Sequence, residues 1–258
     1  FAAILLIVGI IEFALYIDGA SYIDFIFQQL EGFLSIEGNV LNGYLVCFII
    51  LQTLIIQMPL LVALITGDLI SGEAANGTLR LLLTRPVSRS ELVFAKFTAG
   101  SFYVLILLLL LGVLSLGGSL LLFGEGDLII LKSETINVLK GSDVLWRFYG
   151  AFVIAFLSLS VVSSFSLMLS CFTDNSIGPI IITMAVIVIF TIIGSFDLPL
   201  FDHIKPFLFT SYMIVWRKMF DQPIDWGLMG TSIAILMIHI VLFLSISLYY
   251  FNRKDIHS

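Results

Sequence analysis

Charged side chains are scarce in this sequence. Only 12% of the 258 residues are Asp, Glu, Lys or Arg, whereas 60% are apolar. A soluble globular protein of this size needs many more polar side chains to cover its surface. The scarcity therefore excludes a soluble globule and favours a chain that lies in a lipid bilayer.

Several signatures of catalysis are also missing. None of the six lysines follows a glycine, so the chain lacks the Gly-Lys-Ser or Gly-Lys-Thr phosphate loop of an ATPase. His203, His239 and His257 are isolated, and no HExxH pair indicates a metalloprotease. Cys47 and Cys171 lie far apart without ligand-like neighbours, which argues neither for a disulfide nor for a metal. We expect no catalytic residue, no cofactor, no metal and no nucleic-acid partner.

What the sequence has instead is long runs without charge. A helix needs roughly 20 apolar residues to cross about 30 Å of hydrocarbon. Five windows are free of charge for at least 22 positions, namely residues 38–67, 97–124, 148–173, 175–196 and 226–252. Residues 1–17 are apolar apart from Glu12. We interpret this run as a trimmed span, because it lacks the basic start of a signal peptide.

These runs predict an all-α integral membrane protein that forms a single transmembrane domain over residues 1–258. We expect a multi-pass protein of the cell membrane, with the lipid bilayer as its surroundings. The six transmembrane helices are expected at about residues 1–17, 41–66, 93–123, 147–172, 177–196 and 228–251.

Basic residues indicate the orientation of these spans. Four of them fall in residues 67–96, and Arg253 and Lys254 lie in the tail, which six spans place on the same side. Short cytoplasmic loops carry an excess of Lys and Arg. Each side holds six basic residues, but the outer segments are longer and residues 18–37 hold four acidic side chains and no basic one. The density of basic residues therefore predicts that segment 67–96 is cytoplasmic.

Two of the outer segments have amphipathic patterns. Apolar residues recur at helical spacing in the first, which predicts a helix on the outer interface, at Ile23, Phe27, Leu30 and Leu34. Between spans five and six we expect short interfacial or re-entrant helices, with one face formed by Phe209, Met213, Trp216 and Phe220. We interpret these aromatic side chains as interfacial anchors, with a ligand-binding box as the alternative.

The segment between spans two and three carries the densest local signals, reading GDLISGEAANGTLRLLLTRPVSRSELVFAK over residues 67–96. Thr78 is placed to cap a short helix through Leu83 that ends before Pro86, because the residue before a proline avoids helical geometry. Ser88 and Glu91 have the spacing of a capping box for the helix that becomes span three. We therefore expect a rigid connection with a defined fold.

This connection also has an apolar side. Leucine occupies four of five successive positions beside the arginines, at Leu79, Leu81, Leu82 and Leu83. A rigid cytoplasmic segment with an apolar surface is suited to binding a protein partner. The alternative is that the leucines contact headgroups or pack against neighbouring spans, and the pattern alone does not separate the two.

The run GEAANGTLRLLLTRPVSRSELVFAK resembles the signature region of the ABC-2 type permease family, with its Gly-Glu, Gly-Thr-Leu, Leu pair, Pro, Ser-Arg and Lys. Residues 206–226 resemble the outer segment before the last span of that family. The ending from Tyr250 to Asp255 resembles its Phe-x-Arg-Arg-Asp close. The resemblance covers nearly the whole chain, although the cytoplasmic amphipathic helix that precedes span one in the family is absent here.

The resemblance implies the membrane subunit of an ATP-driven exporter in a bacterial or archaeal cytoplasmic membrane. Its partners would be a second permease subunit, identical or different, and ABC ATP-binding subunits that hold the ATP and Mg. Residues 67–92 would form the coupling segment, whose helix binds a groove of the ATP-binding subunit. The coupling role would fall to Glu73, Gly77, Thr78, Leu79, Leu82, Pro86, Ser88 and Arg89.

Polar residues within the spans are candidates for a substrate path, because such residues usually face protein or water. They are Glu12, Gln52 and Gln57, and the kink expected at Pro59 leaves space for Gln57. Glu12 has the alternative of reaching the outer interface. Span four carries serines at helical spacing, which favours close packing over a substrate-lining role.

The sequence leaves two other functions open: a stand-alone channel or secondary transporter, and a non-transporting membrane anchor of an ATPase-driven machine. The first class usually places several charged residues within its spans, whereas Glu12 is nearly alone here. Nothing in the apolar spans identifies a substrate.

Overall fold

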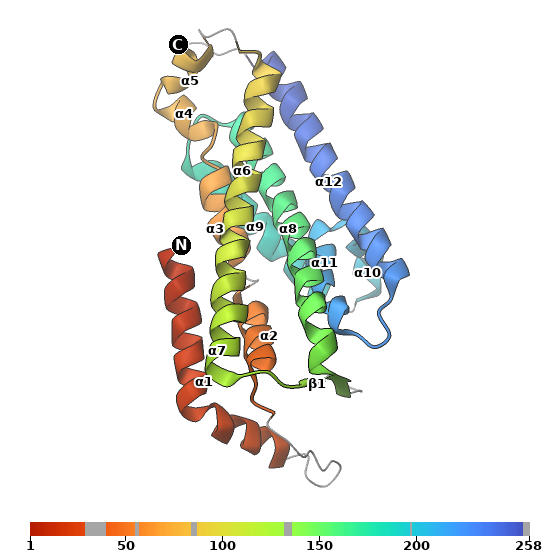
Figure 1. The fold of residues 1–258 in the computed structure, drawn as a ribbon. Helices are drawn as coiled ribbons and strands as arrows, with labels where there is room; N and C mark the ends of the chain where they lie inside the picture. Colours follow the sequence, from red (N-terminus) through yellow and green to blue (C-terminus); the bar gives the residue numbers. More distant parts are fainter. Residues whose placement is uncertain (29–39, 55–56, 84–86, 132–135, 197, 255–258) are drawn as a thin grey trace. The chain divides into compact units, whose positions relative to one another are not determined.

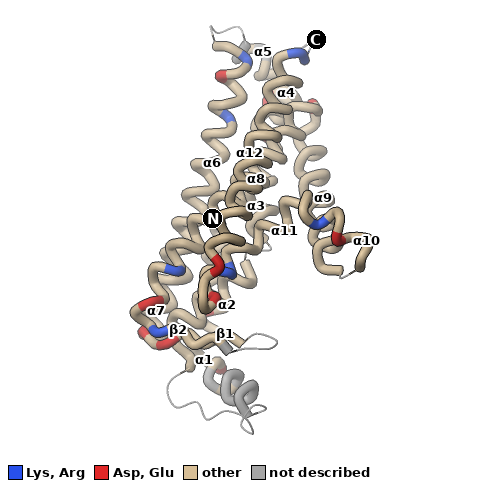
Figure 2. The backbone as a smooth tube through the Cα atoms, turned by 90° about the vertical axis from the view of Figure 1, so that its right-hand side faces the viewer, with Lys and Arg blue, Asp and Glu red and all other residues tan. Residues whose placement is uncertain are grey.

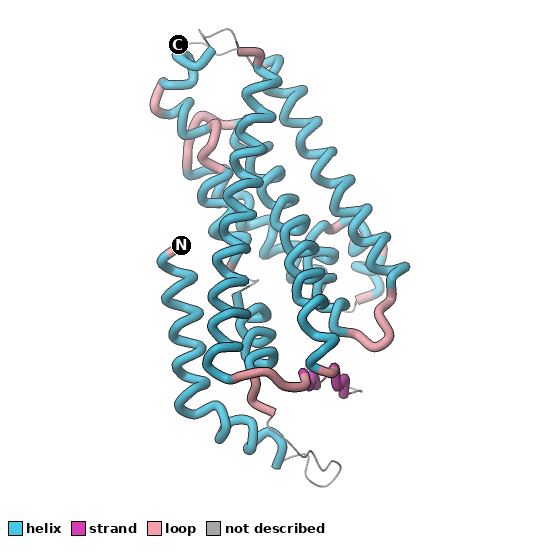
Figure 3. The backbone as a smooth tube through the Cα atoms, in the orientation of Figure 1, coloured by secondary structure: helices cyan, strands magenta, loops and turns pink. Residues whose placement is uncertain are grey.

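The computed structural model describes residues 1–28, 40–54, 57–83, 87–131, 136–196 and 198–254. Helices dominate the described part of the chain, and strands form only one short hairpin (Figure 3). In chain order the first elements are α1 (Ala2–Gln28), α2 (Gly43–Leu54), α3 (Met58–Thr66), α4 (Ser71–Ala75), α5 (Thr78–Leu83), α6 (Arg89–Gly112), the π-helix η1 (Val113–Gly118) and α7 (Ser119–Phe123). The remaining elements are β1 (Leu128–Leu131), β2 (Ile136–Leu139), α8 (Gly141–Phe172), α9 (Ile177–Ser195), α10 (Pro199–Asp202), the 3-10 helix η2 (Lys205–Phe207), α11 (Phe209–Met213), the 3-10 helix η3 (Val215–Phe220) and α12 (Trp226–Arg253) (Figure 1).

Long apolar helices account for most of the chain. Five helical runs in the described residues are long and apolar enough to cross a membrane: Ala2–Gly19 of α1, the continuous run Arg89–Phe123, α8, α9 and α12. Figure 2 shows the long stretches without charge along α6, α8 and α12. A helix satisfies its backbone hydrogen bonds internally, as a lipid environment requires. The mainly helical architecture expected from the sequence is confirmed.

The expected second span is described in two parts, on either side of residues 55 and 56, which lie outside the described residues. Its residues form two shorter helices, α2 and α3, which raise the number of membrane-crossing candidates to six if the pair is one span. Pro59 stands in the first turn of α3, where its missing N–H would have no intrahelical partner in any case. The proline thus lies in the first turn of a helix. The kink that the sequence predicted for this span falls beside residues 55 and 56, which lie outside the described residues.

The described residues cluster into two compact units. Unit 1 consists of Phe1–Ile56, Ile106–Phe152 and Met219–Ile224, and unit 2 of Gln57–Leu105, Val153–Lys218 and Asp225–Ser258. Because α6 and α8 contain the division points, each of these helices supplies residues to both units.

Aromatic rings and one buried arginine organise unit 1. Phe148 of α8 stacks on Tyr44 of α2 and meets Phe220 edge-on, with ring centroids 6.1 and 4.9 Å apart. Beside it, Arg147 donates from Nη1 to the carbonyls of Met219 and Asp221 at 2.8 and 2.9 Å. This arginine holds the end of η3 and the residue that follows it against α8.

Unit 1 also contains the feature that the all-α expectation missed. Strands β1 and β2 pair antiparallel, with Leu128 opposite Leu139 and Leu131 opposite Ile136. Leu128, Ile130 and Leu139 are buried. One face of the hairpin therefore belongs to the core of unit 1, and the fold class needs this correction.

Helix α8 lies at the centre of unit 2, and its serines allow close packing. A Cβ atom on Gly100 of α6 would lie 2.7 Å from Ser163 Oγ, and one on Gly67 would lie 2.8 Å from Ser166 Oγ. All six serines expected in span four are buried, namely Ser158, Ser160, Ser163, Ser164, Ser166 and Ser170. The packing interpretation of these serines accounts for their burial.

The outer segments differ from the expectation in detail. Helix α1 continues through residues 23–28 instead of giving way to a separate helix, and the other half of that predicted amphipathic pattern lies outside the described residues. Short helices do follow α9, as expected. Their aromatic stripe is buried at all four positions, Phe209, Met213, Trp216 and Phe220. These side chains therefore pack in protein cores, contrary to the prediction of interfacial anchors.

Candidate functional site

The segment after α3 is fixed to α8 by a serine. The backbone amides of Ile70 and Ser71 both donate to Ser170 Oγ, at 3.1 and 2.8 Å, and Ser170 Oγ donates to Ser71 Oγ at 3.1 Å. Amides at the start of a helix have no intrahelical acceptor, so a side chain from elsewhere commonly satisfies them. Ser170 satisfies them for α4 and ties this helix to the end of α8.

A glycine sets the turn from α4 into α5. Gly77 has a φ of +71°, a conformation that side chains with a Cβ rarely adopt. Its amide donates to Ala74 O at 3.0 Å, and Thr78 Oγ1 donates to Glu73 O at 3.2 Å. Helix α5 then runs from Thr78 to Leu83, as the sequence predicted. We refer to residues 67–83 below as the α4–α5 segment.

The capping box at the start of α6 is present as predicted. The backbone amide of Ser88 donates to Glu91 Oε2 at 2.8 Å, and the amide of Glu91 donates to Ser88 Oγ at 3.2 Å. Each side chain thus satisfies one backbone donor of the other residue. This exchange fixes the point at which the chain enters α6.

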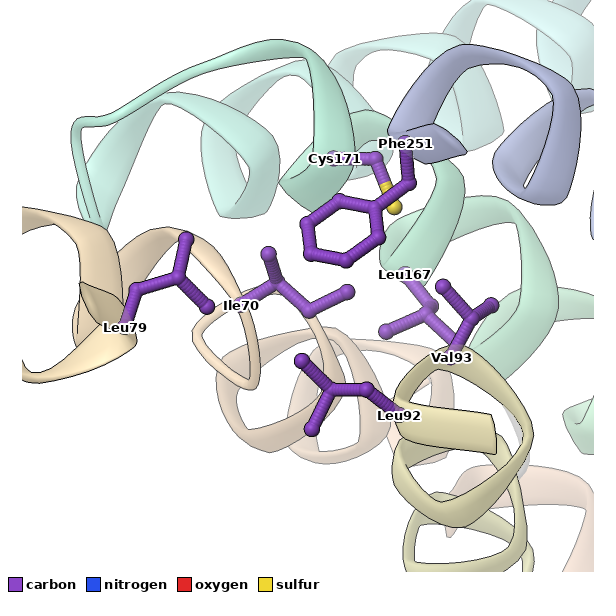
Figure 4. Packing of buried hydrophobic residues seen from close by; sticks show 7 residues of the cluster. All are labelled: Ile70, Leu79, Leu92, Val93, Leu167, Cys171 and Phe251. Atoms are coloured by element: carbon purple, nitrogen blue, oxygen red, sulfur yellow. The ribbon is translucent and has the colours of Figure 1, made fainter. Parts of the chain in front are cut away.

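A buried apolar cluster joins the α4–α5 segment to three long helices (Figure 4). Leu79 is only 2% exposed and packs in the same cluster as Ile70 and Phe251. The cluster draws on α6, α8 and α12 as well as the α4–α5 segment, with Ile70, Leu79, Leu92, Val93, Leu167, Cys171 and Phe251 as its members. Burial of apolar side chains stabilises the folded state by roughly 25 cal/mol for each Å² of apolar surface removed from water.

Ion pairs and charged hydrogen bonds surround the cluster. Lys96 of α6 pairs with Glu73 of α4. Arg89 donates from Nη1 to the carbonyls of Phe251, Asn252 and Lys254 at 3.1, 3.4 and 2.6 Å, which satisfies the end of α12. These contacts link α6 to both α4 and α12.

A further lysine closes the end of α8. Lys254 donates to the carbonyl of Cys171 at 3.1 Å and pairs with Asp174 at 2.7 Å. The α4–α5 segment and the ends of α6, α8 and α12 thus form one bonded assembly within unit 2. A displacement of the segment is therefore opposed by contacts with all three long helices.

Comparison with known proteins places the chain in a family. The family model described as "Protein of unknown function (DUF2705)" matches residues 5–257. The chain belongs to the DUF2705 family. It is also similar to the uncharacterized protein YhcI of Bacillus subtilis (strain 168), with 27% identity over 198 residues. That match covers 75% of this chain and 63% of the relative, so the chain spans less than two thirds of the relative's length.

In this DUF2705 chain, the residues expected to bind an ATPase have mainly structural contacts. Glu73 pairs with Lys96, Leu79 is buried in the cluster, and Arg89 holds the end of α12. Gly77 supplies the positive φ, and Ser88 supplies the cap. The prediction that Leu79 contributes to an apolar surface is therefore wrong, because α6, α8 and α12 enclose its side chain.

Other expected residues face outward or lie outside the description. Thr78 is exposed, and Leu81 leaves 69% of its surface exposed beside the buried Leu79. Pro86 and the side chain of Leu82 lie outside the described part of the chain. Among the described side chains of α5 in this DUF2705 chain, Thr78 and Leu81 are thus exposed.

The three residues expected along a substrate path have different surroundings. Glu12 is buried in α1 and accepts a hydrogen bond from Ser119 Oγ at 3.0 Å. Gln52 is half-buried in α2, and Gln57 is exposed in front of α3. The hydrogen bond that the structure gives Glu12 is thus to a serine of α7 and to neither glutamine.

Sequence reasoning missed several residues that position this DUF2705 fold. Arg147, Ser170 and Lys254 satisfy backbone groups of distant segments. A basic residue at the edge of an apolar run was visible for Arg147 and Lys254. No local pattern identified their acceptors, which lie 72 and 83 residues away.

Proposed function

We propose that this chain is the membrane-spanning permease subunit of an ATP-driven exporter of the ABC-2 type. In this proposal two six-span subunits, identical or different, form the path, and separate ATP-binding subunits hydrolyse ATP. Substrate crosses by alternating access, as the path opens first to one side and then to the other. The resemblance of residues 72–96 to the ABC-2 signature, together with the apolar helices, supports this assignment.

The arrangement of the α4–α5 segment carries the proposal. Its cluster with α6, α8 and α12 means that a partner pressing on the segment also displaces three long helices. Ser170, Lys96 and Arg89 reinforce this attachment with hydrogen bonds and an ion pair. Packed side chains, hydrogen bonds and rigid helices of this kind can carry coupling between a motor and a membrane path.

The outward face of the segment is the proposed docking site. Leu81 presents an apolar side chain next to the exposed Thr78, and partly apolar patches of this kind suit protein partners. In the proposed orientation this face lies in the cytoplasm, where ATP is available. The chain has no phosphate loop of its own, so ATP and Mg belong to the partner.

Co-purification tests the proposal. Full-length chain expressed with its native membrane proteins is captured in detergent, and nucleotide-hydrolysing partners are identified by mass spectrometry. In a Leu81→Asp variant the amount of ATPase recovered with the chain should fall by roughly tenfold or more, as expected when a central interface residue becomes charged. Leu81 is suited to this test because most of its side chain lies outside the buried cluster.

The matched control is Phe207→Asp. Phe207 is 77% exposed and lies in η2, which the proposed topology places on the outer side. It should retain the ATPase. Equal recovery of the partner with both variants, or no ATPase with the wild-type chain, would contradict the proposed docking site.

A non-transporting anchor of an ATPase-driven machine is the second candidate, because the same rigid attachment would serve mechanical work. Vesicles that contain the co-purified complex separate the two functions. A permease should move a labelled hydrophobic compound across the bilayer when ATP is supplied. An anchor would hydrolyse ATP without any transport.

A further inference from the structure

A carboxyl group is buried among apolar helices in unit 1. Glu12 is 9% exposed and lies within the apolar part of α1. Its Oε1 accepts a hydrogen bond from Ser119 Oγ at 3.0 Å. Among the described residues this hydroxyl is its hydrogen-bond partner, and no cation pairs with it.

The π-helix η1 is shaped to receive this group. A Cβ atom on Gly118 would lie 2.8 Å from Glu12 Oε1 and 3.1 Å from Oε2, so any side chain there would displace the carboxyl. A Cβ atom on the neighbouring Gly117, by contrast, would have no atom within 4 Å. Glycine at residue 118 therefore allows the carboxyl of Glu12 to approach this closely, and π-helical turns are frequent at functional sites.

The surroundings of Glu12 contain few ionisable groups. On α2, the thiol of Cys47 donates to Ser115 Oγ of η1 at 3.7 Å. Helices η1 and α7, which also pack against α1, contain no ionisable side chain. On α1 itself, Asp18 is exposed and lies six residues away. No positive charge in these elements offsets an ionised Glu12.

An ionised carboxylate is costly to bury without a cation or several donors. A neutral carboxylic acid avoids most of this cost. The hydroxyl of Ser119 then supplies the hydrogen bond that the carbonyl oxygen of the acid accepts. A metal ion does not fit, because Mg²⁺ and Ca²⁺ need six or more oxygen ligands and the site offers a carboxyl and a hydroxyl.

We propose that Glu12 and Ser119 form a proton-binding site, in which Glu12 is held as a neutral carboxylic acid between α1 and the η1–α7 turn. The proposal rests on the membrane placement of these helices and does not depend on the ATPase. It gives the chain a site that responds to protons inside the apolar region.

Infrared difference spectroscopy of the purified chain in lipid vesicles at neutral pH tests this site. The wild-type spectrum minus that of Glu12→Gln should show the carbonyl stretch of a protonated carboxylic acid. The control is Asp18→Asn, which removes an exposed carboxyl from the same helix and should leave the carbonyl stretch of the protonated acid in place. Ionised bands in the Glu12→Gln difference would overturn the proposal.

Two milder variants keep the test decisive if Glu12→Gln folds poorly. Ser119→Ala should shift the acid carbonyl stretch to higher frequency, because that carbonyl loses its hydrogen bond. Gly118→Ala should displace the carboxyl and alter the band, whereas Gly117→Ala should leave it unchanged. An unaltered band in both Ser119→Ala and Gly118→Ala would refute the site. The measurement uses the permease alone, so it is unaffected by failure of the ATPase assignment.

Discussion

At the scale of single residues, a buried charged side chain joins distant segments of the chain. Arg147 has a nearly buried side chain, yet each of its three guanidinium nitrogens donates to an acceptor. Nε and Nη2 donate to Asp143 Oδ2 at 2.9 and 2.7 Å, and Nη1 donates to the carbonyls of Met219 in η3 and Asp221 just after it. The planar guanidinium can reach these three groups at once, whereas a lysine ammonium acts as a single point charge. The arginine therefore joins the start of α8 to a segment more than seventy residues later.

Replacement of Arg147 should destabilise unit 1. Arg147→Ala removes hydrogen bonds to a charged donor, and we expect a loss of roughly 1.5 to 3 kcal/mol in the free energy of unfolding. Arg147→Lys should recover only part of it. Arg217→Ala, at an exposed arginine over the Trp216 ring, is the control and should change little. Thermal unfolding in detergent measures the three variants, and equal midpoints for Arg147→Ala and Arg217→Ala would contradict this role.

At the scale of elements, helix ends are where distant parts of unit 2 meet. The start of α6 is capped locally by Ser88 and Glu91, but the end of α12 is satisfied by Arg89 from α6. Likewise the start of α4 uses Ser170 of α8. Polar groups thus hold these helix ends together, and the apolar cluster of Figure 4 packs among them.

Loss of the arginine at this junction should fray α12. Arg89→Ala leaves three carbonyls of the last turn without their donor, which we expect to cost roughly 1.5 to 3 kcal/mol locally. Hydrogen exchange monitored by mass spectrometry should then show faster exchange in residues 248–254, by about tenfold or more. Arg253→Ala removes a charge from the same helix end, where Arg253 covers the Tyr249 ring, and serves as the control.

The exchange result also separates two roles for Arg89. Faster exchange shows that the side chain stabilises the end of α12. Reduced binding of an ATPase without faster exchange would instead indicate that Arg89 contacts the partner directly, and would contradict the structural role described above.

At the scale of the whole molecule, the proposed orientation follows from the distribution of basic residues. It places the α4–α5 segment and the end of α12 in the cytoplasm, and the β1–β2 hairpin outside. Both native cysteines are buried, so an introduced cysteine can report its side of the membrane with little background. Thr78 and Lys140 are exposed positions suited to this purpose.

Labelling with a membrane-impermeant maleimide tests the orientation. Lys140→Cys should react in intact cells, because the hairpin end is expected to face outward. Thr78→Cys should react only after the membrane is permeabilised. Reaction of Thr78→Cys in intact cells would place the α4–α5 segment outside and remove it from any cytoplasmic ATPase.

Local sequence patterns were sufficient to predict structure where backbone hydrogen-bonding groups find their partners nearby in the chain. The capping box at Ser88 and Glu91 and the short helix beginning at Thr78 were predictable, because their hydrogen-bonding partners lie within five residues. The hairpin was also accessible in principle, since two runs rich in Ile, Leu and Val flank a short polar stretch. It was missed because the apolar spans on either side dominated the pattern.

The sequence by itself determined that the chain is mainly helical, with apolar runs long enough to cross a membrane, because composition and window length fix those properties residue by residue. Only the tertiary structure decided which apolar and polar side chains face inward. Leu79 and Leu81 are both leucines of α5, yet one is enclosed by α6, α8 and α12 and the other is exposed. Likewise, the buried site of Glu12 is formed by Ser119 and Gly118, which lie more than a hundred residues away in the sequence. Burial is a property of partners brought together by folding, and no local pattern specifies those partners.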